Sequence, residues 1–204
     1  MSHVRSVRVA TACVLMLSAT LACAHKTKEE KAKVDVGMDP AIAAEFMRRV
    51  DAYVKLSKEQ GAKLPKLPKN ATPQQVDQDQ RTFEQLMVAA RSDAKQGDII
   101  ILPMQAYIRA LLAEVFAGPL GKSEKNAVHD EPHPVQPVIN KRYPDEVPLA
   151  TMPPKLLANL PQLPDQLEYR FVHNDLILMD VHAHIILDYV EGAMAPTRPS
   201  TQTP

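Results

Sequence analysis

The chain has few residues of the kinds that build reactive or aromatic sites. Of its 204 residues two are cysteine, none is tryptophan, and 4% are aromatic. Both cysteines, Cys13 and Cys23, lie near the start of the chain, so the rest of it has no disulfide framework, no cysteine nucleophile and no cysteine-based metal site. The scarcity of aromatic side chains leaves no stacking platform for bases or sugars.

An excess of charge of either sign is also missing. Lys plus Arg number 24 and Asp plus Glu number 24, so the formal net charge is zero at pH 7. A nucleic-acid-binding domain normally has a basic surface that neutralises phosphates. We therefore expect no nucleic-acid partner.

Proline, in contrast, is abundant. The chain has 18 prolines, nearly twice the usual share of about 5%. Nine of them lie in the segment 131–164, where they exclude a long helix or a central strand. Apolar residues are interspersed among them, which predicts that this segment runs extended and packs on the domain, with one helical turn at 154–159.

The first 23 residues have the pattern of an export signal. Two arginines and no acid precede Val9–Ala22, an uncharged apolar run too short for a membrane-spanning anchor. Two kinds of processing fit the end of the run. Cleavage after Ala24 would follow an Ala-x-Ala pattern, and lipidation of Cys23 would follow a pattern that resembles the bacterial lipobox, although Thr20 stands where Leu is usual.

These alternatives give two expected locations. The first is a lipoprotein anchored in a membrane through Cys23 and facing the periplasm, and the second is a soluble periplasmic or secreted protein. Residues 24–37 are rich in Lys and Glu, as in a solvated tether. One small domain is expected over 38–192, followed by a disordered tail over 193–204 that is rich in Pro, Ser and Thr.

Apolar spacing predicts three helices, at about 39–60, 73–96 and 103–117. Gly61 and Gly97 follow the first two and are expected to end them. The third is apolar around most of its circumference, which predicts a buried central helix. We do not expect it to span a membrane, because Gln105, Arg109 and Glu114 would be costly in lipid.

The C-terminal part changes from helical spacing to alternation, which predicts a β-hairpin over 167–190 with a turn at His173 and Asn174. Composition does not decide whether residues 182–190 form strand or helix. The fold class expected from the whole pattern is mainly α with a small C-terminal β element, an α+β protein with three helices, a proline-rich extended segment and a hairpin.

Few residues are candidates for chemistry. His182 and His184 would share one face of a strand and could bind a metal, but they would diverge on a helix. His133 or Glu191 could supply a further group, as third ligand or as base. The three aspartates of the hairpin region are each explained as a turn, strand-edge or cap residue: Asp175, Asp180 and Asp188. No serine lies in a nucleophile elbow, and the glycines of 118–123 are too close together for a phosphate loop.

The C-terminal half resembles an uncharacterised family of exported bacterial proteins. The resemblance covers about the last 110 residues. It is carried by Tyr143–Pro154, by Leu167–Phe171 with the run Leu-Glu-Tyr-Arg-Phe, by Asp180 and Asp188, and by the turn Gly97–Ile99. The resemblance implies export and no established activity. It also implies Asn where His184 stands and varied residues at position 182, which argues against a metal site shared by the family.

Two functions follow as hypotheses. We expect a non-catalytic binding or accessory lipoprotein of the cell envelope, with no cofactor, whose partner is an envelope protein or a wall component. The alternative is a small metal-binding protein or metal-dependent enzyme that uses His182 and His184.

Overall fold

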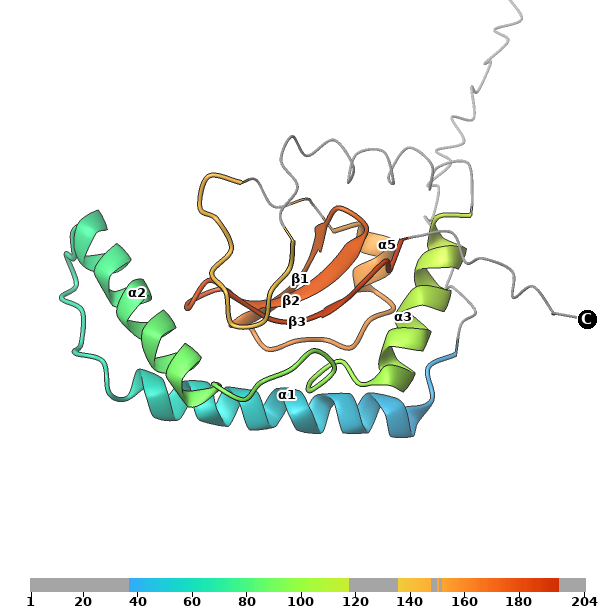
Figure 1. Cartoon of the computed structure of the whole chain (residues 1–204), viewed down its shortest axis with the longest axis horizontal. Helices are drawn as coiled ribbons and strands as arrows, with labels where there is room; N and C mark the ends of the chain where they lie inside the picture. Colours follow the sequence, from blue (N-terminus) through green and yellow to red (C-terminus); the bar gives the residue numbers. More distant parts are fainter. Residues whose placement is uncertain (1–36, 118–135, 148–149, 151, 195–204) are drawn as a thin grey trace, which may run out of the picture. The chain divides into compact units, whose positions relative to one another are not determined.

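The computed structural model of the chain describes residues 37–117, 136–147, 150 and 152–194. These residues form helices and one antiparallel sheet near the C-terminal end (Figure 1), so the predicted α+β fold class is confirmed. The elements are α1 (Pro40–Gly61), α2 (Pro73–Ala90), α3 (Leu102–Val115), α5 (Pro154–Leu157), β1 (Leu167–Val172), β2 (Asp175–Asp180) and β3 (Ile185–Val190).

The first two helices begin at strong sequence signals. The side chain of Asp39 accepts a 2.8 Å hydrogen bond from the Ala41 N–H at the start of α1. Thr72 and Gln75 form a reciprocal capping box at the start of α2. Each helix also has proline at its first position, where a missing N–H costs nothing.

The second helix is shorter than predicted. It ends at Ala90 instead of continuing to about residue 96. Arg91 leaves the helical conformation with φ −122° and ψ 31°, and its side chain is buried. Arg91 is the C-cap of α2, and its N–H still donates to the carbonyls of Met87 and Val88.

The third helix is the most buried, as its composition predicts. Half of its 14 residues are buried, among them Ile108, Leu111 and Leu112. It packs against α1 and α5. No helix among the described residues is long and apolar enough to cross a membrane.

The sheet is a meander in the order β1-β2-β3. His173 and Asn174 form the predicted turn between β1 and β2, with His173 in the left-handed region at φ 53°. The structure resolves the open choice for residues 182–190: His182 and His184 lie in a turn, and β3 begins at Ile185. The predicted hairpin therefore has a third strand.

Both faces of the sheet are covered. One face of the sheet packs with the three long helices in the main hydrophobic core, which includes Phe46, Phe83, Ile108 and Leu178. Figure 1 shows α1 running along the sheet, with α2 and α3 at the two ends of α1. The other face forms a second cluster that consists of Tyr143, Val147, Val172, Ile177, Met179 and Ile186. This double burial explains why β2 is apolar at consecutive positions.

The described parts of the proline-rich segment pack on the sheet, as the sequence predicts. The N–H of Asn140 donates to the carbonyl of Ile186, and the N–H of Ile186 donates to the carbonyl of Lys141, so the outer edge of β3 is paired. An isolated bridge between Ala150 and Phe171 lies on the β1 edge. The sheet thus has backbone partners at both edges, which limits pairing with other chains.

The predicted leader, nearly all of the predicted tether, and residues 195–204 of the predicted tail lie outside the described residues. The start of that tail is part of the domain. Ala193 and Met194 are each 4% exposed, and the N–H of Met194 donates to the carbonyl of Asn174. The domain therefore extends beyond its predicted end at residue 192.

Candidate functional site

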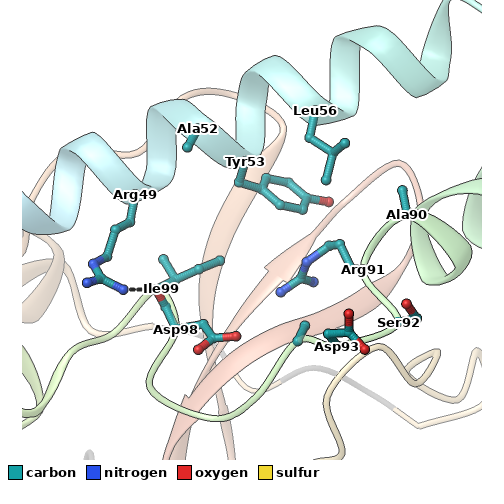
Figure 2. A pocket seen from close by; sticks show the side chains of 11 residues that line it. Arg49, Ala52, Tyr53, Leu56, Ala90, Arg91, Ser92, Asp93, Asp98 and Ile99 are labelled. Atoms are coloured by element: carbon teal, nitrogen blue, oxygen red, sulfur yellow. Dashed lines mark hydrogen bonds between the residues drawn. The ribbon is translucent and has the colours of Figure 1, made fainter.

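An open cavity of about 400 Å³ lies between α1 and the segment that follows α2. Arg49, Tyr53 and Leu56 line it from α1, and the segment 90–94 with the Asp98–Ile99 turn lines it from the other side (Figure 2). Its volume is at the lower end of the range of small-ligand pockets, about 300 to 1,000 Å³. The cavity is therefore a candidate binding site among the described residues.

Arg91 forms part of the cavity wall and is held from the protein side. It is 9% exposed, and its guanidinium donates to Asn140 Oδ1 at 2.8 Å and to the Leu187 carbonyl at 3.0 Å. Asn140 Nδ2 returns a 2.6 Å hydrogen bond to the Arg91 carbonyl. The guanidinium carbon lies 5.2 Å from the centre of the Tyr53 ring, as in a cation–π contact. Burial lowers the pKa of Arg91.

Tyr53 connects this region to a buried carboxylate. Its hydroxyl donates a 2.6 Å hydrogen bond to Asp180 Oδ2, and Asp180 Oδ1 accepts from the N–H groups of His182 and Ala183 at 2.7 and 2.8 Å. Burial raises the pKa of Tyr53, and the charge of Asp180 raises it further. Tyr53 therefore stays protonated as a donor, and Asp180 fixes the turn between β2 and β3.

Asp188 on β3 performs a similar task for the turn before α3. Its two oxygens accept from the N–H groups of Gly97, Ile99, Ile100 and its neighbour Tyr189, at 2.7 to 2.9 Å. Burial raises the pKa of Asp188, whereas these N–H groups act to lower it. Gly97 has φ 89°, a conformation that favours glycine. The turn is therefore attached to the sheet by a side chain and not by strand pairing.

Arg49 is the other cation at the cavity. Its Nε lies 2.6 Å from Glu45 Oε1, and its Nη1 donates to the Asp98 carbonyl at 2.6 Å. Glu45 also pairs with Arg48, and the hydrogen bonds from Arg48 and then Arg49 lower the pKa of Glu45 to about 2. Both arginines therefore pair with Glu45, but Arg49 lines the cavity and Arg48 does not.

The two candidate metal-binding histidines do not face a common point. His182 stacks on Phe83 with ring centroids 4.3 Å apart, and its Nε2 lies 3.1 Å from Asp79 Oδ2 on α2. His184 Nε2 lies 3.6 Å from Asp145 Oδ1 in the proline-rich segment. They lie in a turn and not on a strand, so the geometry that would place them on one face is absent. His133 lies outside the described residues.

The backbone of His184 has a conformation that few residue types adopt readily. Its φ is 55°, in the left-handed region that Asn tolerates better than most residues. An Asn at this position would suit the turn without any metal. Across the described residues, no group of three or more His, Cys, Asp or Glu side chains is arranged to hold a metal ion.

No family model matches the chain, and neither a curated protein nor a solved structure matches it.

Sequence reasoning missed Arg91 and the roles of Tyr53 and Asp180. A signal was present for Arg91, because the buried positions Phe83 and Met87 of α2 continue at the same spacing of four to residue 91. A charged residue on an apolar stripe indicates a buried polar contact. The partner in that contact could not be found, since Asn140 is 49 residues away in the sequence.

Proposed function

We propose that this protein is an exported accessory protein of the bacterial cell envelope that binds a partner or ligand and does not catalyse a reaction. The export-type leader supports its location. Cys23 at the end of the apolar run supports a lipid anchor in a membrane, and the Lys- and Glu-rich segment 24–37 would serve as the tether. The family resemblance to exported bacterial proteins remains part of this proposal.

The internal hydrogen bonds of the buried polar groups are the observation that supports binding over catalysis. Asp180 and Asp188 accept hydrogen bonds from backbone N–H groups that fix turns, and the Tyr53 hydroxyl and the Arg91 guanidinium also have internal partners. A general base or nucleophile needs an unengaged atom that can reach substrate. These groups stabilise the fold, and the cavity that Tyr53 and Arg91 line offers surface for binding.

The alternative, a metal-binding protein or metal-dependent enzyme, gains no support from His182 and His184. Each lies beside a different carboxylate, Asp79 for one and Asp145 for the other. A catalytic zinc site needs three protein ligands on one ion. We therefore do not adopt this alternative.

Fractionation of cells that express the full chain tests the proposal. We expect the wild-type protein in the membrane fraction and a Cys23→Ala variant in a soluble exported fraction. Cys13→Ala is the matched control, because it changes the other cysteine of the leader and should leave the protein in the membrane. Recovery of wild type and Cys23→Ala in the same soluble fraction would contradict the lipid anchor, and recovery in the cytoplasm would contradict export.

A further inference from the structure

The end of α1 and the connector that leads to α2 form a strongly basic surface. Residues 55–69 contain five lysines and one acid, Glu59, in a chain whose charges balance overall. Each of the five lysines is exposed, and among the described residues no ion pair involves any of them: Lys55, Lys58, Lys63, Lys66 and Lys69. This lysine surface, residues 55–69, therefore has a positive charge that the described fold does not neutralise.

The connector presents its charges on a backbone that is already ordered. Pro65 and Pro68 fix their own φ and favour extended conformations for Leu64 and Leu67, the residues before them. Leu64 packs against the main core, and its N–H donates to the Gly61 carbonyl at 3.1 Å. Binding through this segment thus costs little conformational entropy.

The residue types of the connector favour lipid over protein as the anionic partner. Leu67 is 42% exposed and lies between Lys66 and Lys69 in the sequence. Such a segment suits a membrane interface, where an apolar side chain and the lysine stems contact acyl chains while the ammonium groups reach phosphates. A lysine ammonium is a flexible point charge, whereas a fixed pattern of carboxylates on a protein favours the planar fork of arginine.

The lysine surface lies at the end of α1 opposite Pro40, beside the start of α2 (Figure 1). The 22 residues of α1 span about 33 Å. We infer that the lysine surface binds the anionic lipid headgroups of the membrane in which Cys23 is proposed to be anchored. This inference rests on the proposed lipid anchor. Attachments at both ends of α1 would hold this helix along the membrane surface.

Vesicle cosedimentation of the processed Cys23→Ala protein tests the inference, because this protein keeps the lysine surface and lacks a lipid chain. We expect a partition coefficient at least about tenfold higher for phosphatidylcholine vesicles with about one third phosphatidylglycerol than for phosphatidylcholine alone. Raising the salt from about 0.1 M to about 1 M should remove most of this difference, since the Debye length falls from about 10 Å to about 3 Å. Equal partition into both kinds of vesicle would overturn the inference.

Two triple variants separate the lysine surface from the attraction of the whole chain. Replacement of Lys63, Lys66 and Lys69 by Gln should lower partition into the anionic vesicles at least about tenfold. The matched control replaces three exposed lysines elsewhere, Lys95, Lys141 and Lys155, by Gln, and its partition should stay within about twofold of the parent protein. Circular dichroism checks that both variants are folded. Equal losses for the two would overturn the inference.

A pair of leucine variants tests the contact of the connector with the lipid interface. Leu67→Ala should lower partition at least about threefold, because less apolar surface leaves water. Leu102→Ala is the control, since Leu102 is 77% exposed at the start of α3, and it should change partition less than about 1.5-fold. Equal effects would overturn the placement of the connector at the interface.

Calorimetry with poly-glutamate tests the other class of anionic partner. Binding to this polymer without binding to anionic vesicles would overturn the lipid assignment in favour of an acidic polypeptide. The vesicle binding expected of a few lysines is reversed by dilution and salt, so Cys23→Ala still enters the soluble fraction of cells. Wild type without a lipid would contradict the anchor and not the vesicle binding, so the two proposals can fail separately.

Discussion

The hydroxyl of Tyr53 on α1 donates a 2.6 Å hydrogen bond to Asp180 at the end of β2, 127 residues later in the chain. Asp180 is fully buried and also fixes the following turn through its other oxygen. This one carboxylate therefore connects the first helix to the sheet and sets the path between two strands.

Tyr53→Phe should lower the free energy of unfolding by about 1.5 to 3 kcal/mol, because a buried carboxylate oxygen loses its hydroxyl donor. Denaturant unfolding monitored by circular dichroism measures the change. Tyr189→Phe is the control, since Tyr189 is only partly buried and its ring packs against the second cluster; it should change stability by less than about 0.5 kcal/mol. Equal losses for the two variants would contradict the role of the Tyr53–Asp180 bond.

Asp188→Asn should be more damaging. The Asp188 carboxylate accepts hydrogen bonds from four backbone N–H groups, and the NH₂ group of Asn would face two of them, donor against donor. We expect the free energy of unfolding to fall by about 3 kcal/mol. Asp175→Asn is the comparison, because the Asp175 side chain accepts from one N–H group among the described residues, that of Gly192, and about 1 kcal/mol is expected. Hydrogen exchange should show the Gly97–Ile100 amides exposed in the Asp188 variant, and unchanged protection there would refute the account.

Arg91→Lys should destabilise the protein by about 2 kcal/mol, since an ammonium cannot reproduce the planar donor pattern toward Asn140 and Leu187. Arg81→Lys offers a control at an exposed arginine that pairs with Asp77 on the same helix, where about 0.5 kcal/mol or less is expected. Thermal and denaturant unfolding of both variants would check this. A lysine that was tolerated equally well at both positions would argue against a planar requirement at residue 91.

His184 should make stability depend on pH. Burial, and next the charge of Arg142, lower its pKa in the folded protein below the ordinary value of 6.5. Below that value the unfolded chain takes up a proton that the folded protein does not, so stability is lost as the pH falls from 6.5 toward the folded pKa. Above pH 6.5 both states are neutral at this residue, and this loss is absent.

The variant that tests this is His184→Asn, because Asn suits the left-handed backbone and does not titrate. The difference in unfolding free energy between variant and wild type should favour the variant more at about pH 5.5 than at about pH 8. A difference that is the same at both values would show that His184 does not contribute to the pH dependence.

Local signals in the sequence were sufficient for most of the fold. Asp39 and Thr72 precede the first two helices, and His173 with Asn174 separates two strands, because capping and turn chemistry depend on neighbours in the chain. The early end of α2 could not be predicted, because Phe83, Met87 and Arg91 continue one helical stripe past Ala90. The turn at residues 182–184 did have a local signal, because Asp180 accepts hydrogen bonds from the N–H groups of His182 and Ala183, two and three residues later.

The candidate site was less predictable. Histidines at alternating positions suggested a metal, but that pattern requires a strand, and Asp180 instead holds the backbone of His182 and Ala183 in a turn. The cavity is formed by side chains from α1 and from the segment after α2, and their approach depends on packing of the whole core. No short-range pattern contains that information.

Intact mass of the protein recovered from the membrane fraction of its native cells, with Cys23→Ala alongside, shows directly whether Cys23 carries a lipid. We expect a chain that begins at Cys23 and carries a diacyl or triacyl increment, which the variant lacks. An unmodified chain that begins at His25 would contradict the lipid anchor, and a full-length chain that retains Met1 and the apolar run would contradict export altogether.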